Sequence, residues 1–274
     1  MSVYAGKNIA ILGGSGTLGR ALVRELSETE VSRILVFSRD EIKQLEMMET
    51  FPSEKYPMLD YKLGDVRDLP RLKEVLEGMD FVIHAAAIKH VVMAEKNPEE
   101  CHKTNVIGTQ NVIEACRVNN ITRAILISTD KAVNPIGVYG KSKKEAERGW
   151  LTANEPNFDM FKVVRLGNII GARGSVFEAF EKQRKSGVIK VTHPDATRFC
   201  ISQEEAAQFV LQAFESEKQE VLVPQMNSFH VLKLAKKIGP ECKIDIIGLR
   251  PGDKLHEEIN GVSSSSALLE LKKI

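Results

Sequence analysis

Residues 128–143 concentrate side chains that could transfer protons. The reactive groups in this stretch are Ser128, Thr129, Asp130, Lys131, Tyr139 and Lys143. Tyr139 and Lys143 lie four residues apart in a stretch of helical character, so both side chains project from one helical face. Because a neighbouring ammonium favours the phenolate, we expect the pKa of Tyr139 to fall from about 10 toward working pH. The pair therefore suits proton transfer.

A buried strand is expected to deliver these groups. The apolar run 124–127 leads directly into the polar residues 128–131, and Asn134, Pro135 and Gly137 then form a loop. Polar side chains directly after an apolar run are typical of the carboxyl end of a buried parallel strand. The reactive groups should therefore lie at the edge of a sheet.

A glycine-rich turn near the start of the chain indicates a dinucleotide site. The apolar strand 8–12 runs into the turn 13–19, and residues 20–26 have helical spacing. Glycines in this context permit a tight turn and a close approach of the backbone to a pyrophosphate at a helix N-terminus. The residues expected to bind there are Gly13, Ser15, Gly16, Thr17, Leu18 and Gly19.

The end of the second predicted strand, residues 33–37, bears on the choice of cofactor. Ser38, Arg39 and Lys43 follow this strand. A carboxylate at this point would bind the ribose hydroxyls of NAD, whereas a hydroxyl and a guanidinium can bind a 2′-phosphate. We therefore expect NADP. NAD is the alternative, because Asp40 could bind ribose as well as begin the next helix.

Two further strand ends are expected to contact the cofactor. These contacts are Asp65 and Val66 after the strand 58–63, which would bracket adenine, and Ala85, Ala86 and Lys89 after the strand 80–84. Asn105 lies on the inward stripe of a helix predicted over 97–118, where it could bind backbone or brace the loop that holds Tyr139. His84 and His90 have no metal-ligand spacing, so we interpret them as packing residues.

Alternating strands and helices up to residue 150 predict an α/β fold, namely a Rossmann-type doubly wound parallel sheet with a small C-terminal substrate-binding lobe. We expect an NADP-binding domain over 1–166, with later strands as candidates to complete its sheet, a substrate-binding lobe over 167–260 and a tail over 261–274. The predicted substrate contacts are Lys89, Asn168, Arg173, Arg198 and Arg250. Three loop arginines converging on one cleft would suit a diphosphate, although each alone could be a surface charge.

The elements expected after the sixth strand are short. They are a helix over 176–185, a strand over 189–192, a polar junction at 197–199, a helix over 204–214, a strand over 221–223, a helix over 229–238, a strand over 243–247 and a low-complexity turn at 263–266.

Composition excludes several other classes of protein. The chain has 274 residues, 43% of them hydrophobic, and a formal net charge of +1, so we expect no nucleic-acid partner. No apolar stretch approaches the roughly 20 residues of a membrane span, and no leader is apparent before the first strand. The four cysteines have no paired spacing, so we expect reduced thiols, no metal and a soluble cytoplasmic protein.

These motifs together resemble the extended short-chain dehydrogenase/reductases, and within them the inverting UDP-N-acetylglucosamine 4,6-dehydratases of polysaccharide and flagellar-sugar biosynthesis. The stretches that carry the resemblance are 38–41, 84–90, 128–135, 165–175, 197–199 and 250–257. The chain departs from the family pattern at Leu12, Leu166 and Asp253, where threonine, tyrosine and glutamate are usual. The resemblance implies a lyase that binds NADP and a nucleotide sugar, and we expect a homo-oligomer.

The resemblance also implies roles for the reactive groups. Tyr139 would take the proton of the 4-hydroxyl as hydride leaves carbon 4, and Lys143 would hold the ribose and lower the tyrosine pKa. Lys131 would remove the proton on carbon 5 while Asp130 protonates the departing 6-hydroxyl, so the pKa of Lys131 must fall and that of Asp130 must rise. The alternative is that Asp130 and Lys131 form a structural ion pair.

Two rival functions stay open at this stage. A nucleotide-sugar 4-epimerase would use Tyr139 and Lys143 but would need no elimination base. A cofactor-sensing protein on the same fold would bind NADP without turning over a sugar, because function resides in the site and not in the fold.

Overall fold

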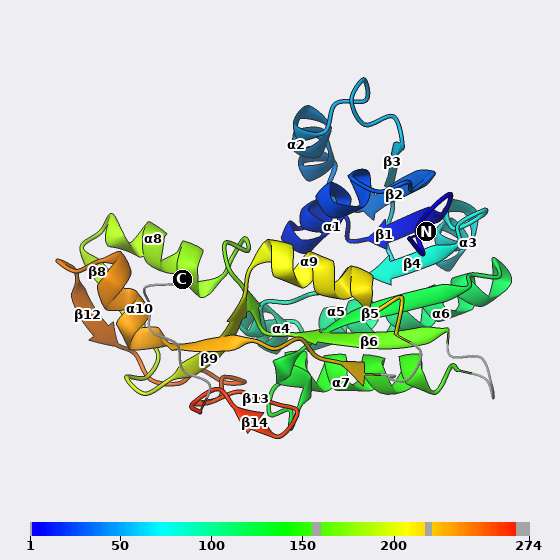
Figure 1. Cartoon of the computed structure of the whole chain (residues 1–274). Helices are drawn as coiled ribbons and strands as arrows, with labels where there is room; N and C mark the ends of the chain where they lie inside the picture. Colours follow the sequence, from blue (N-terminus) through cyan, green and yellow to red (C-terminus); the bar gives the residue numbers. More distant parts are fainter. Residues whose placement is uncertain (1, 155–159, 217–220, 267–274) are drawn as a thin grey trace.

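A seven-stranded sheet forms the centre of the computed structural model, which describes residues 2–154, 160–216 and 221–266 (Figure 1). The strand order is β10-β6-β5-β4-β1-β2-β3, and all neighbouring pairs are parallel. The strands are β1 (Asn8–Leu12), β2 (Arg33–Ser38), β3 (Leu59–Leu63), β4 (Phe81–His84), β5 (Arg123–Thr129), β6 (Phe161–Leu166) and β10 (Val221–Leu222). The order reverses between β1 and β4, which is where ligands bind in such sheets. The predicted Rossmann-type fold is confirmed.

Helices cover both faces of the sheet because parallel strands need crossover connections. In chain order they are α1 (Thr17–Ser27), α2 (Glu41–Thr50), α3 (Leu69–Val75), α4 (Val91–Lys96), α5 (Pro98–His102), α6 (Gly108–Val118) and α7 (Val138–Leu151). The single α-helix predicted over 97–118 is interrupted by a π-helical turn, Lys103–Ile107, which contains Asn105. Among the helices of the described residues, none is long and apolar enough to cross a bilayer.

Two hydrophobic cores lie on opposite faces of the sheet. Ile9 and Ile11 point into one core and Ala10 and Leu12 into the other, and all four are fully buried. Successive residues of a strand point to opposite faces, so an uninterrupted apolar run is what a strand covered on both faces requires.

Later segments complete the first half of the molecule. Helix α9 (Gln203–Gln212) packs against α1 and contributes Ala206 and Val210 to the same core as Ile9, while β10 forms one edge of the sheet. The chain therefore returns to the sheet after residue 167, and the predicted domain boundary does not separate two independent sets of contacts.

A smaller lobe lies beyond one end of the sheet (Figure 1). It comprises β7 (Asn168–Ile169), α8 (Val176–Arg184), β8 (Val188–Val191), β9 (Thr197–Ile201), β11 (Asn227–His230), α10 (Val231–Ile238), β12 (Lys243–Ile246), β13 (Glu258–Ile259) and β14 (Val262–Ser263). Phe180, Ile189 and Phe229 form its core. Two predictions are wrong here. The polar junction at 197–199 is part of the buried strand β9, and residues 229–230 belong to a strand that precedes the helix.

The serine-rich segment 263–266 forms the predicted turn, and buried contacts anchor it. Ser264 is fully buried, and its hydroxyl accepts a hydrogen bond of 2.9 Å from the Glu257 backbone amide. The same hydroxyl lies 2.7 Å from that of Thr197. Serine composition alone does not reveal such partners, which are distant in sequence. The rest of the predicted tail, residues 267–274, lies outside the described residues.

Candidate active site

The turn after β5 places a carboxylate and an amine in direct contact. Asp130 begins a 3-10 turn, Asp130–Ala132, and is fully buried. The Lys131 Nζ lies 2.9 Å from Asp130 Oδ1, and the hydroxyl of Thr129 donates to the same oxygen at 2.9 Å. The ion pair considered from the sequence is therefore present in the structure. Asp130 Oδ2 and the buried hydroxyl of Ser128 have no hydrogen-bond partner among the described residues.

Helix α7 places Tyr139 and Lys143 beside this turn. The helix begins at Val138, whose backbone amide donates to Glu95 Oε1 at 2.7 Å. Gly140 faces the backbone carbonyl of Lys131 at a distance that leaves no room for a side chain. Both Tyr139 and Lys143 are buried. The close approach of α7 to the turn therefore places Tyr139 and Lys143 beside the segment that carries Thr129, Asp130 and Lys131.

The pKa of Tyr139 is raised, whereas a fall was expected from the sequence. Burial raises the pKa of Tyr139 to about 12, although the Lys131 charge and the Thr129 hydroxyl lower it in part. Lys143 instead donates a hydrogen bond of 2.7 Å to the carbonyl of Ile127, and burial lowers its own pKa to about 8. The expected fall in the tyrosine pKa is therefore wrong for this arrangement, because desolvation outweighs the neighbouring cation.

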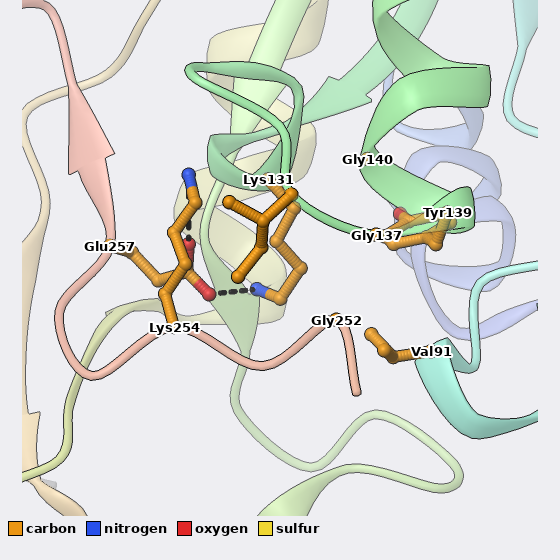
Figure 2. Close-up of a pocket in the computed structure, with 9 residues that line it drawn as sticks. Val91, Lys131, Gly137, Tyr139, Gly140, Gly252, Lys254 and Glu257 are labelled. Atoms are coloured by element: carbon orange, nitrogen blue, oxygen red, sulfur yellow. Dashed lines mark ion pairs between the residues drawn. The ribbon is translucent and has the colours of Figure 1, made fainter. Parts of the chain in front are cut away.

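The expected fall in the pKa of Lys131 is also wrong for this arrangement. Burial favours the neutral amine, but the charges of Asp130 and Glu257 more than compensate, so the pKa of Lys131 is raised above its ordinary value. Glu257 Oε1 lies 3.4 Å from the Lys131 Nζ, and Figure 2 shows this ion pair between two residues that line a small cavity. The influence of Glu257 on the charge of Lys131 was not predicted from the sequence.

Asn105 braces the loop after β4 against α7. Its Oδ1 accepts from the Ile88 amide at 2.8 Å, and its Nδ2 donates to the Ile88 carbonyl at 3.0 Å and to the Ser142 hydroxyl at 2.9 Å. The Ser142 hydroxyl in turn donates to the carbonyl of Tyr139 at 2.8 Å. The buried amide thus supports the first turn of α7, as one of the two sequence interpretations predicted.

The glycine-rich turn has the shape that a pyrophosphate needs. Gly13 has φ 87°, and a Cβ there would lie 2.7 Å from the Ala86 backbone nitrogen. Gly16 is the N-cap of α1, and Gly19 packs directly on the backbone of Gly14. These contacts bring the turn against the loop after β4, with Ala85 and Ala86 partly exposed beside it. The free amides at the start of α1 fit a bound dinucleotide phosphate.

The residues that would distinguish NADP from NAD lie together after β2. The Ser38 hydroxyl accepts from the Ser15 hydroxyl at 2.9 Å and from Gln44 Nε2 at 3.0 Å. The exposed Arg39 extends toward Asp65 at 3.4 Å. Asp40 caps α2 by accepting from the Lys43 amide at 3.0 Å, as the competing interpretation proposed.

An open hollow of about 540 Å³ lies where the adenine was expected. Asp65, Arg67, Leu69 and Asn111 are among its lining residues. Val66 is buried and does not line this hollow, and its side chain occupies the space that a Cβ at position 108 would need. Of the two expected adenine contacts, Asp65 therefore lines the hollow, and Leu69 rather than Val66 supplies an apolar wall.

The three predicted substrate arginines have different partners. Arg173 lies beside α2, where its guanidinium is 2.6 Å from Glu46 Oε2. The Lys89 ammonium donates to the Arg173 carbonyl at 2.8 Å. Arg250 pairs with Asp253 at 2.7 Å.

Arg198 is buried in β9, and its guanidinium donates to the Lys254 carbonyl at 2.9 Å. Asn168 Oδ1, by contrast, lies 3.5 Å from the Lys131 Nζ. Asn168 thus contacts Lys131 directly, whereas the three arginines have separate partners among the described residues and do not converge on one cleft in this arrangement.

His84 is a packing residue, as the sequence indicated. It is almost fully buried, its Nε2 lies 3.1 Å from the Thr109 hydroxyl, and its ring packs against Trp150. Burial lowers the pKa of His84 to about 3, so the ring is neutral. The His90 ring packs against Gly174, which leaves no space for a side chain there.

Sequence reasoning missed three residues of the site. Glu95 fixes the start of α7, Lys254 donates to the Val133 carbonyl, and Glu257 contacts Lys131. Lys254 and Glu257 belong to a stretch that the family resemblance had already singled out. Glu95 had no signal, because an acidic residue near a helix end is usually a solvated charge.

The fold and the site define a class of protein. A parallel sheet with its reversal at β1 and β4, a glycine-rich turn after β1 and a Tyr139–Lys143 pair beside the end of β5 characterise a short-chain dehydrogenase/reductase. A family model described as "Polysaccharide biosynthesis protein" matches residues 9–274, and the chain belongs to this family.

Known proteins similar to the chain include two nucleotide-sugar enzymes. It is 42% identical over 262 residues to the UDP-N-acetylglucosamine 4,6-dehydratase (inverting) of Campylobacter jejuni subsp. jejuni serotype O:23/36 (strain 81-176), covering 93% of this chain and 78% of that protein. It is 35% identical over 270 residues to the UDP-glucose 4-epimerase of Rickettsia canadensis (strain McKiel), covering 94% and 78%. The family resemblance read from the sequence is confirmed.

Solved structures support the same fold. The X-ray structure of Pen from Bacillus thuringiensis has a TM-score of 0.88 and 34% identity, and the match covers 93% of this chain and 84% of that one. DesIV from Streptomyces venezuelae, a dTDP-glucose 4,6-dehydratase, has a TM-score of 0.82 at 16% identity, with 97% and 94% covered, which shows the fold alone.

Proposed function

We propose that this protein is a configuration-inverting UDP-N-acetylglucosamine 4,6-dehydratase, a lyase that produces a UDP-2-acetamido-2,6-dideoxy-4-keto-hexose. The observation that carries the proposal is the contact of Asp130 with Lys131, 2.9 Å apart, within the site that also holds Tyr139. An oxidation and reduction on this fold need only Tyr139 and Lys143. An acid and a base beside them supply the means to eliminate water.

The cofactor proposed for this site is NADP. The close approach at Gly13, the amides at the start of α1 and the exposed Arg39 fit a dinucleotide with a 2′-phosphate. When bound, NADP+ would accept hydride from carbon 4 and later return it to carbon 6, and its positive ring would favour the Tyr139 phenolate. Ser38 and Lys43 would support the 2′-phosphate.

The chain's own residues would move the protons. The Tyr139 phenolate takes the proton of the 4-hydroxyl, and the resulting ketone acidifies the hydrogen on carbon 5. Lys131, as the neutral amine, removes that proton, and Asp130, as the carboxylic acid, donates a proton to the departing 6-hydroxyl, which leaves as water. Once hydride has returned to carbon 6, a proton from solvent would add to carbon 5 on the opposite face, which inverts it. Thr129 would hold Asp130 through its hydrogen bond of 2.9 Å.

The predicted substrate contacts enter this proposal in two groups. Asn168 would meet the sugar, since its amide oxygen lies 3.5 Å from the Lys131 Nζ. Lys89, Arg173, Arg198 and Arg250 would meet the nucleotide diphosphate, and this role requires them to exchange their present partners for phosphate oxygens.

Two further expectations stay predictions. The four free thiols fit a reducing compartment such as the cytoplasm. Assembly into a homo-oligomer follows from the family resemblance and has no other support.

A 4-epimerase is the second candidate, favoured by the similarity to the Rickettsia enzyme. Incubation of the purified protein with UDP-N-acetylglucosamine, UDP-glucose and other nucleotide sugars, followed by mass spectrometry, separates the two. Loss of one water from UDP-N-acetylglucosamine supports the dehydratase. An isomer of unchanged mass supports the epimerase, and binding of NADP without any product supports a sensor.

A further inference from the structure

One buried carboxylate reaches the reactive cluster from the C-terminal lobe. Glu257 is 1% exposed and directly precedes β13. Its Oε1 lies 3.4 Å from the Lys131 Nζ and 3.9 Å from the Arg198 Nε, while its Oε2 lies 3.9 Å from the Lys254 Nζ. Figure 2 shows the carboxylate between the two lysine side chains. Glu257 is therefore the acidic centre of a group of three cations.

The backbone of Glu257 is held firmly in this place. Its amide donates to the Ser264 hydroxyl at 2.9 Å, and its carbonyl accepts from the Ser264 amide at 2.8 Å. The Ser264 hydroxyl lies 2.7 Å from that of Thr197 in β9. Hydrogen bonds through Ser264 to Thr197 of β9 thus place the carboxylate beside Lys131 in this arrangement, so its position follows that of the segment 257–264.

The cavity beside this contact is too small for a sugar. It has a volume of about 10 Å³, close to the space for one water molecule. Lys131 and Tyr139 line it from one side, and Gly252, Lys254 and Glu257 line it from the other. A hexose can reach Tyr139 only if part of this lining moves, and the segment 252–257 contributes Gly252, Lys254 and Glu257 to it.

We propose that Glu257 is a positioning residue that holds the Lys131 ammonium until the substrate enters, and releases it as the C-terminal segment moves. This inference rests on the proposed function, because it concerns the amine that serves as the elimination base. On release, the ammonium gives its proton to Asp130, 2.9 Å away, so that Lys131 becomes a neutral amine able to accept the proton from carbon 5 and Asp130 becomes the carboxylic acid. Substrate entry and activation of the base would then be one event.

The charged and titratable groups around Lys131 support this coupling. They are Asp130 on the same turn, Tyr139 on α7, Arg198 on β9, and Lys254 and Glu257 on the C-terminal segment. Asp130 and Glu257 together raise the pKa of Lys131, against burial and against Arg198. An opposite charge at such a distance shifts a pKa by about 1 to 3 units, so the loss of one carboxylate favours the neutral amine.

The test compares two adjacent carboxylates. E257Q removes the charge beside Lys131 and retains most of the shape. E258Q is the matched control, because the side chain of Glu258 is exposed and accepts a hydrogen bond of 2.8 Å from Asn134. We expect the ascending limb of kcat/KM against pH, which reports the free enzyme, to move down by about one unit or more in E257Q and to stay in place in E258Q. A residue that only supports the fold would lower kcat/KM at every pH. An unmoved limb in E257Q overturns the inference.

A second measurement does not depend on turnover. The pKa of Lys131 is followed in the substrate-free protein by 13C NMR of labelled lysine side chains, with the resonance identified from K131R. We expect a lower pKa of Lys131 in E257Q than in the wild type and no change in E258Q. Equal values in all three proteins would overturn the inference.

If E257Q does not fold, E257D, which withdraws the carboxylate by one methylene, should give a smaller shift in the same direction. A wild type that forms no keto-sugar would refute the proposed function, while this titration would still decide the role of Glu257.

Discussion

The cofactor half and the reactive cluster of this molecule are assembled differently. Most of the predicted cofactor contacts come from short segments that follow individual strands, and glycine at position 13 has the positive φ that the tight turn requires. The reactive cluster instead joins the turn after β5 to a segment of the C-terminal lobe, as shown by the Lys254–Val133 hydrogen bond, whose partners are 121 residues apart. Local backbone geometry governs the first region, and long-range charge contacts govern the second.

Because of this difference, the two regions should depend differently on protonation. A dinucleotide needs a shaped backbone, which hardly depends on protonation. Proton transfer needs defined charge states, and here Lys131 is held as an ammonium by Asp130 and Glu257. Substitutions in one region should therefore leave the function of the other measurable, and the following predictions test this separation.

The largest effect is expected for K131A. Loss of the elimination base should lower the rate of keto-sugar formation by about 10²- to 10⁴-fold, while NADP binds as in the wild type. The rate is measured by mass spectrometry and cofactor affinity by fluorescence titration. K141A, an exposed lysine on α7, is the control and should retain full activity. Normal turnover in K131A would mean that Lys131 is not the elimination base and that its contact with Asp130 in the wild type is a structural ion pair.

G13A should affect the opposite region. The new Cβ would lie 2.7 Å from the Ala86 nitrogen in a residue with positive φ. We expect NADP to bind roughly 10- to 100-fold more weakly, from a strain of about 1–3 kcal/mol. G149A is the control, because a Cβ there meets no atom within 4 Å. Unchanged affinity in G13A would show that the turn does not approach a bound cofactor.

R39A tests the choice of cofactor. Removal of a guanidinium that contacts the 2′-phosphate should weaken NADP binding by about tenfold and leave NAD binding nearly unchanged. Isothermal titration with both nucleotides measures the ratio. R24A is the control, since Arg24 lies on α1 in an exposed pair with Glu204. If both nucleotides lose affinity equally, Arg39 does not read the 2′-phosphate.

The smallest effect concerns stability. Burial lowers the pKa of Lys143 to about 8, so between pH 8 and the unfolded value near 10.5 the unfolded state binds more protons than the folded state. The free energy of unfolding of the cofactor-free protein should therefore gain about 1 kcal/mol per pH unit from this group as the pH rises through that window. Urea unfolding of K143M against pH should show a slope smaller by that amount, and K144M, on the exposed side of α7, should not. Identical slopes for K143M and the wild type would contradict the lowered pKa of Lys143.

Much of this structure could be predicted from the sequence because its signals are local. The strand at 8–12, the glycine turn and the polar end of β5 each follow from a few consecutive residues. The contact between Asn105 and the start of α7 also followed, since a polar side chain on an apolar stripe needs a partner.

The remaining features depend on partners that are distant in sequence. The burial of Arg198 in β9 and of Ser264 beside Glu257 could not be inferred from composition. The pKa values of Tyr139 and Lys131 were expected to fall, but desolvation in one case and a second carboxylate in the other reverse the direction. Spacing identifies which groups can meet, and burial and long-range charges then decide their protonation.

Dehydration through carbon 5 is tested most directly by a reaction with UDP-N-acetylglucosamine in deuterium oxide, followed by proton NMR and mass spectrometry of the product. We expect a keto-sugar that has lost one water and carries one solvent deuterium at an inverted carbon 5. A product of unchanged formula that is inverted only at carbon 4, with no deuterium at carbon 5, would contradict the account.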